Sequence, residues 1–156
     1  MSKLDILGII DQVQRHADRL QWAKEQLQKQ APFTERNIQA QDDINTAIID
    51  QFIFRFAKLQ DSMGAQLFPA ILELTAEPGP MNTFIDKLNR LEKIGALASA
   101  EQWLSLREMR NQIAHEYPDD PGMQAATLNK ALKQADTMLQ ISRSVKGFLE
   151  PYLPNQ

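Results

Sequence analysis

The 156-residue sequence contains no cysteine and only two histidines. The absence of cysteine excludes a disulfide framework, a zinc–thiolate site and a cysteine nucleophile, and it fits a reducing compartment. Two histidines provide few ligands for a metal cage. We therefore expect no metal site and no cofactor, and a fold stabilised by its apolar core.

The sequence also has no uninterrupted apolar run long enough to span a bilayer, and residues 1–5 lack the pattern of a signal peptide. We therefore expect a cytoplasmic protein that does not bind a membrane. Seventeen basic and twenty acidic side chains give a net charge of −3, so no global positive field attracts nucleic acid. Between residues 86 and 110, five basic side chains exceed four acidic ones by one, which by itself does not indicate RNA binding.

What the sequence does contain is helical periodicity. Near the start, apolar residues recur at the spacing of one helical face, at Leu7, Ile10, Val13, Ala17, Leu20 and Leu27. This first helix should run to about Lys29. A second helix, opened by Asp42 and Asp43, is expected to lie centrally and to continue to about Ile71, with a bend near Gly64 or Pro69.

Capping and breaking residues predict three further helices. Their ends are marked by Asn82 or Thr83 and Gly95, by Ser99 and Pro118, and by Asp120 with Pro121, from which the last helix reaches about Leu149. The sequence has no internal repeat and no alternating, strand-like run. The pattern therefore predicts one all-α domain over residues 1–156, a four- to five-helix up-and-down bundle.

Arg110 departs from this plain bundle pattern. On a helical wheel of ~100° per residue, four aromatic or aliphatic residues fall within roughly 60° of it: Trp103, Leu106, Ile113 and Tyr117. A charge in an apolar stripe must reach a partner or a wet cleft, because burying it unpaired costs several kcal/mol. Arg110 either reaches solvent or a carboxylate on another helix, or it is a functional arginine.

The residues after Arg110 allow the same two interpretations. Asn111 and His115 are four positions apart and share an adjacent face, so one cluster could hold them with Arg110 and Tyr117. His115 falls in the last turn, where the helix dipole favours a charged imidazole that can move protons. Alternatively, His115 only interacts with the dipole or a terminal carbonyl, and Tyr117 is a core aromatic with a surface hydroxyl.

The whole segment resembles the signature of the HEPN superfamily, in which an arginine is followed by four residues, a histidine, one residue and a tyrosine. It reads Arg110-Asn111-Gln112-Ile113-Ala114-His115-Glu116-Tyr117. In that family the motif lies near the end of a late helix of a four- or five-helix bundle. The short chain looks most like HepT-type toxins and the related nucleotidyltransferase substrate-binding subunits.

The resemblance implies a metal-independent endoribonuclease that acts on RNA as a homodimer. His115 would then move a proton, Arg110 would hold the phosphate, and Asn111 and Tyr117 would bind or orient the substrate. The implied partner is a nucleotidyltransferase antitoxin, which in some pairs adds AMP to the motif tyrosine, here Tyr117. Modification would occlude the cleft and add negative charge.

Two other functions use the same sequence differently. In the first, the bundle is a non-catalytic binding subunit of a nucleotidyltransferase pair, with Arg110 binding phosphate without promoting cleavage. In the second, it is a plain helical interaction module that uses the amphipathic first and last helices.

Three other features of the sequence are weaker indications of function. Arg55 stands between two phenylalanines and either extends a phosphate site or, as we favour, forms a structural ion pair, with Asp61 as a candidate partner. His16 lies among polar residues and is expected on the solvated surface. The acidic pairs at 42–43 and 119–120 are explained by capping and dipole roles.

Overall fold

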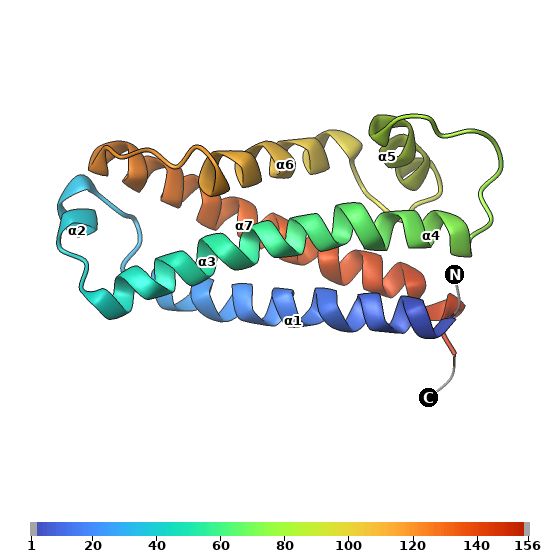
Figure 1. The fold of residues 1–156 in the computed structure, drawn as a ribbon, viewed down its shortest axis with the longest axis horizontal. Helices are drawn as coiled ribbons and strands as arrows, with labels where there is room; N and C mark the ends of the chain where they lie inside the picture. Colours follow the sequence, from blue (N-terminus) through green and yellow to red (C-terminus); the bar gives the residue numbers. More distant parts are fainter. Residues whose placement is uncertain (1–2, 155–156) are drawn as a thin grey trace.

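A computed structural model of the chain describes the backbone of residues 3–154 and the side chains of residues 5–154. Over this range the predicted all-α, up-and-down bundle is confirmed, and there is no strand. Four long elements form the bundle: α1 (Lys3–Gln28), α3 (Asp43–Ser62) continued by α4 (Phe68–Leu74), α6 (Ala100–Ala114) and α7 (Pro121–Leu149). Neighbouring elements run antiparallel (Figure 1). Both α1 and α6 contact α3 and α7.

The core is filled by aliphatic and aromatic side chains from all four long elements. Phe52 and Phe56 of α3 and Leu20 of α1 are fully buried, and these two helices contact one another. Trp103 of α6 packs edge-on against Phe68 of α4, with ring centroids 4.7 Å apart. No helix in the described range is both long and apolar enough to cross a membrane.

The second predicted helix is interrupted where a bend was expected. Residues Met63–Leu67 form a π-helical turn, η1, between α3 and α4, and Gly64 lies within it. Pro69 follows in the first turn of α4 and has no N–H to donate to a carbonyl of the preceding turn. The sequence predicted a bend near Gly64 or Pro69; the structure has a change in helical register there, since the N–H of Phe68 donates to the carbonyl of Met63, five residues earlier.

A short helix, α2 (Glu35–Gln39), was not predicted. It lies between the first two predicted helices, shortly after Pro32. In the structure the Thr34 hydroxyl accepts a hydrogen bond from the Asn37 N–H, and the Asn37 side chain accepts one from the Thr34 N–H. This capping box satisfies two free donors, and α2 then packs against α7.

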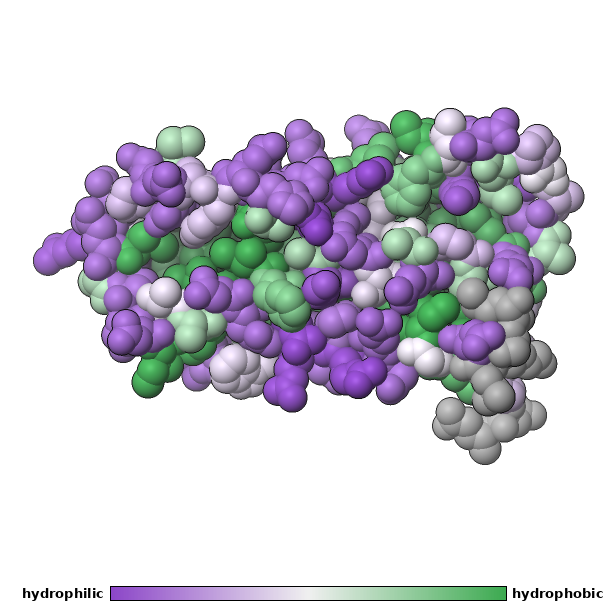
Figure 2. Space-filling model, in the orientation of Figure 1, coloured by the Kyte–Doolittle hydropathy of each residue, from purple (hydrophilic) through white to green (hydrophobic). Residues whose placement is uncertain are grey.

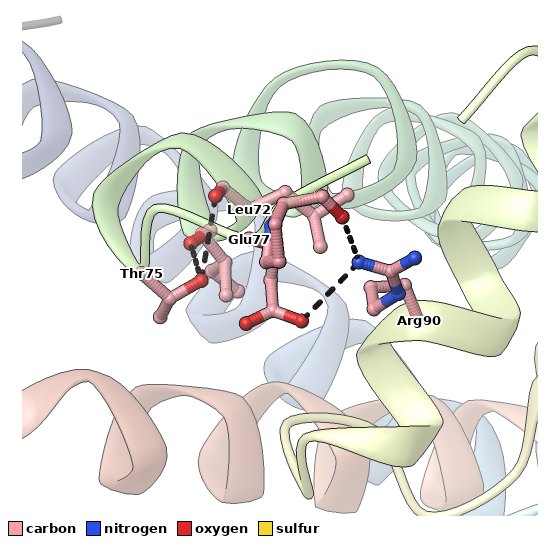
Figure 3. A network of polar contacts seen from close by, with 6 residues as sticks. Leu72, Thr75, Glu77 and Arg90 are labelled. Carbon is pink, nitrogen blue, oxygen red and sulfur yellow. Dashed lines mark hydrogen bonds and ion pairs between the residues drawn. The ribbon is translucent and has the colours of Figure 1, made fainter. Parts of the chain in front are cut away.

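The loop between α4 and α5 (Phe84–Lys93) is fastened by Arg90. Its guanidinium donates to the carbonyl of Pro78 at 2.5 Å and lies 3.5 Å from the Glu77 carboxylate (Figure 3). Thr75, at the end of α4, donates its hydroxyl to the carbonyls of Ile71 and Leu72. These contacts hold α5 beside α4 and α6.

The predicted caps of the later helices are confirmed. Thr83, Ser99 and Asp120 accept backbone N–H groups at the starts of α5, α6 and α7. Gly95 follows the end of α5 with φ of 85°, a left-handed conformation that glycine adopts without strain. After α7 a single 3₁₀ turn, η2 (Glu150–Tyr152), extends the last helix.

Candidate functional site

The Arg110 side chain extends from the apolar stripe of α6 to a carboxylate on α3. Its Nε and Nη2 atoms donate to the two oxygens of Asp61 at 3.0 and 2.8 Å. Only 18% of the Arg110 side chain is exposed, against 43% of the Asp61 side chain. Hydrogen bonding to Asp61 raises the pKa of Arg110 above its ordinary value, against the opposing effect of burial. The first of the two interpretations, that Arg110 reaches a carboxylate on another helix, is therefore confirmed. The two hydrogen bonds hold the guanidinium in one orientation.

The third guanidinium nitrogen contacts His115. Arg110 Nη1 lies 2.5 Å from His115 Nε2. Arginine only donates hydrogen bonds, so Nε2 is the acceptor and the neutral imidazole carries its proton on Nδ1. His115 is exposed and stands at the C-cap of α6, where its backbone N–H donates to the Asn111 carbonyl. The structure therefore brings the two predicted catalytic residues into direct contact.

The other two predicted site residues are placed differently. Tyr117 is half-buried, and burial first and the charge of Asp50 second raise the pKa of its hydroxyl. It therefore lies close to α3. Asn111 is exposed, and within the described part of the chain its side chain forms no hydrogen bond. The structure therefore brings together two of the four expected residues, Arg110 and His115. Tyr117 lies near Asp50 instead, and the Asn111 amide is exposed to solvent.

A groove of about 340 Å³ runs between α3 and α6 beside this pair. We call it the α3–α6 groove; it is lined by Asp50, Ile53, Phe54, Ala57, Lys58, Asp61, Arg110 and Ala114. Phe54 is 48% exposed within it. Figure 2 shows hydrophobic side chains gathered on the surface between these two helices, surrounded by polar ones.

Asp61 and Asp50 are functional candidates that sequence reasoning did not place. Both line the groove, and they lie eleven positions apart on α3, which is three helical turns. Their place on one face of α3 could be predicted from that spacing. Which helix this face lies against could not be predicted.

Arg55 and His16 correct two predictions. Arg55 does not pair with Asp61; its Nη1 lies 2.8 Å from His16 Nδ1 on α1. Residues 55 and 61 are six positions apart and point about 120° away from one another around the helix. His16 is only 9% exposed, so the prediction of a solvated surface position was wrong. Burial, followed by the charge of Arg55, lowers the pKa of its imidazole.

Among the described residues, no group of three histidine, cysteine, aspartate or glutamate side chains is placed to hold a metal ion. The site brings together the Arg110 guanidinium, the His115 imidazole and the Asp61 carboxylate. Comparison of the chain with family models, curated proteins and solved structures found no match. The HEPN resemblance therefore depends on the eight-residue signature and on its place at the end of α6 in a helical bundle.

Proposed function

We propose that this protein is a metal-independent endoribonuclease, the toxin subunit of a HEPN and nucleotidyltransferase toxin–antitoxin pair in the cytoplasm. The observation that supports it best is the contact between Arg110 and His115 beside an open groove. A phosphate-binding cation and a neutral imidazole are the two groups that such a reaction needs. Exposure of His115 leaves it accessible to a polymeric substrate.

In the proposed reaction, a phosphodiester of RNA displaces the imidazole from Arg110. The part of the Arg110 guanidinium that Asp61 does not hold, Nη1 with the second N–H of Nη2, then binds the phosphate oxygens, and Nε2 of His115 becomes free to accept the proton of the 2′-hydroxyl. The 2′-oxygen bonds to phosphorus while the bond to the 5′-oxygen breaks, and the leaving oxygen takes a proton from solvent. The products carry a 2′,3′-cyclic phosphate and a 5′-hydroxyl. Asp61 keeps Arg110 oriented throughout, so it is a positioning residue.

The proposal includes a homodimer formed through α3. Asp50, Phe54 and Lys58 are spaced by four residues, so they lie along one face with the aromatic ring in the middle. Antiparallel packing about a two-fold axis at Phe54 would place each Asp50 opposite the Lys58 of the second copy. The same packing would cover the exposed Phe54 ring and bring two grooves together.

A nucleotidyltransferase partner would act on Tyr117. Burial and the charge of Asp50 raise the pKa of this hydroxyl above its ordinary value, so it is harder to deprotonate and the partner must supply a base to activate it. AMP attached there would place a phosphate close to the α3–α6 groove, where it would compete with RNA for Arg110.

One observation favours the second candidate, a non-catalytic substrate-binding subunit. Asp61 binds Arg110 through both oxygens and lessens the positive potential offered to an RNA phosphate. In that case the groove binds a nucleotide or the partner, and His115 has no role in proton transfer.

The deciding experiment is cleavage of a cellular RNA pool by the purified full chain in excess chelator. His115→Ala and Arg110→Ala should each lose about 100-fold or more in rate, with unchanged helix content. Arg36→Ala, which removes an exposed arginine of α2, is the matched control and should cleave normally. Equal activity in all variants would identify a contaminant. The absence of cleavage by protein whose mass shows no adduct on Tyr117 would favour the binding subunit.

A further inference from the structure

A second cleft lies along α3 and η1, on the other side of Asp61 from the α3–α6 groove. It has a volume of about 330 Å³, within the range of small-ligand sites. We call it the α5 cleft; its lining residues are Gln60, Asp61, Gly64, Ala65, Pro69, Phe84, Lys87 and Arg107. Asp61 lines both cavities, so the α5 cleft adjoins the proposed catalytic groove.

The α5 cleft presents two cations that are not neutralised by a carboxylate. Within residues 5–154, neither Lys87 nor Arg107 forms an ion pair. Arg107 stands one helical turn before Arg110 on α6, so the two arginines are neighbours on that helix. Cations in this arrangement can contact successive phosphates of one strand.

An aromatic ring lies against one of these cations, Arg107. The Arg107 guanidinium covers the ring of half-buried Phe84, with 4.9 Å between its Cζ and the ring centroid. Aromatic rings and guanidinium planes are the surfaces on which bases of single-stranded nucleic acid stack. The cleft therefore combines the two elements of non-sequence-specific single-strand binding.

Behind the lining of the α5 cleft, the indole Nε1 of buried Trp103 has no hydrogen-bond partner among the described residues. It lies 3.7 Å from the point where a Cβ on Gly64 would stand, as does Cζ of Phe84. A buried donor without an acceptor is uncommon, and this one is closed off from solvent by the packing around it. Gly64 belongs to η1, and π-helical turns of this kind occur often at functional sites.

We infer that the α5 cleft is a nucleotide subsite, which binds one base and its phosphate from a single strand of RNA next to the scissile position. The identity of the ligand, single-stranded RNA, rests on the function proposed above. Phe84 and Arg107 stack the base, and Lys87 contacts the phosphate. The strand then continues past Asp61 to Arg110.

The test measures binding separately from cleavage. A short 2′-O-methyl oligouridine has no free 2′-hydroxyl and cannot be cut, so fluorescence anisotropy gives its affinity for the unmodified full chain over a range of salt concentrations. Lys87→Gln should weaken binding severalfold and lower the slope of log affinity against log salt by about 0.7, the value for one phosphate on a single strand. Phe84→Leu should weaken binding about tenfold without changing that slope, because it removes stacking alone.

Lys93→Gln is the matched control, since it removes an equal charge from an exposed position on the same helix. It should leave affinity and slope unchanged. The subsite would be refuted if Lys87→Gln and Phe84→Leu bound like Lys93→Gln, or if the unmodified chain did not bind the oligonucleotide. Binding with the expected variant pattern, but no cleavage of unmodified RNA, would sustain the subsite and refute the ribonuclease. Cleavage with no effect of these variants would do the reverse.

Discussion

Arg110 links three parts of the site, because its guanidinium on α6 contacts Asp61 of α3 and His115 at the end of α6. Its predicted place in the apolar stripe of α6 is confirmed, because Trp103, Leu106 and Ile113 around it are buried. Its partner was not predicted. Helical spacing shows which side chains share a face, but the face that α3 turns toward α6 depends on the packing of the whole bundle.

The Arg110–Asp61 pair should stabilise the fold only modestly. Asp61→Asn keeps the shape of the side chain and removes its charge. We expect a loss of about 1 kcal/mol in the free energy of unfolding, because Asp61 is partly exposed and solvent screens the pair. Urea denaturation measures this, with Asp11→Asn, in the more exposed pair with Arg15, as a control that should show no change. A loss as large as that of a buried ion pair, about 3 kcal/mol or more, would contradict this account.

His16 should make stability depend on pH. Burial and the charges of Arg55, Lys58 and Arg15 lower its pKa in the folded chain from 6.5. The unfolded chain then binds the proton more readily, so the contribution is complete above pH 6.5 and is lost as the pH falls through the lower folded value. We expect the free energy of unfolding to decrease as the pH falls below about 6.5. His16→Asn, which retains an acceptor for Arg55, should remove part of that decrease; equal slopes in the two proteins would show that His16 is not the group responsible.

At the scale of helices, the sequence predicted the ends of the elements better than their continuity. Ser99 and Asp120 cap the helices they were expected to cap, because a side-chain oxygen before a helix satisfies a free N–H whatever surrounds it. The five-residue helix α2 was missed because so short a helix is not stable by itself. It depends on its contact with α7, which a local pattern does not reveal.

The π-helical turn η1 allows a direct test of why Gly64 is present. A Cβ added there would meet its nearest neighbours, Phe84 and Trp103, at an ordinary distance of 3.7 Å. Gly64→Ala should therefore raise the free energy of unfolding by about 0.5–1 kcal/mol, since alanine loses less backbone entropy on folding. It should also weaken oligonucleotide binding, because the methyl group occupies the floor of the α5 cleft. Thermal unfolding measures the first effect; a destabilised variant would show that glycine is needed for the turn itself.

At the scale of the whole molecule, the face of α3 that carries Asp50, Phe54 and Lys58 predicts a homodimer. Reversing one charge on this face should dissociate the dimer, and reversing both should restore it. Asp50→Lys places like charges opposite one another across the proposed two-fold axis, so it should yield a monomer. Combining it with Lys58→Asp restores opposite charges and should restore the dimer. Sedimentation velocity at low and high salt distinguishes these cases. A monomeric unmodified chain, or a double variant no better than the single one, would remove α3 from the interface.

If Arg110 and His115 act as one catalytic unit, a double-mutant cycle on the cleavage rate will show it. Single-turnover rates in chelator would be measured for the unmodified chain, Arg110→Ala, His115→Ala and the double variant. Groups that act as a unit are strongly non-additive, so we predict that the double variant cleaves no more slowly than either single variant. Losses that simply multiply, or a His115→Ala variant that cleaves at the full rate, would contradict the account.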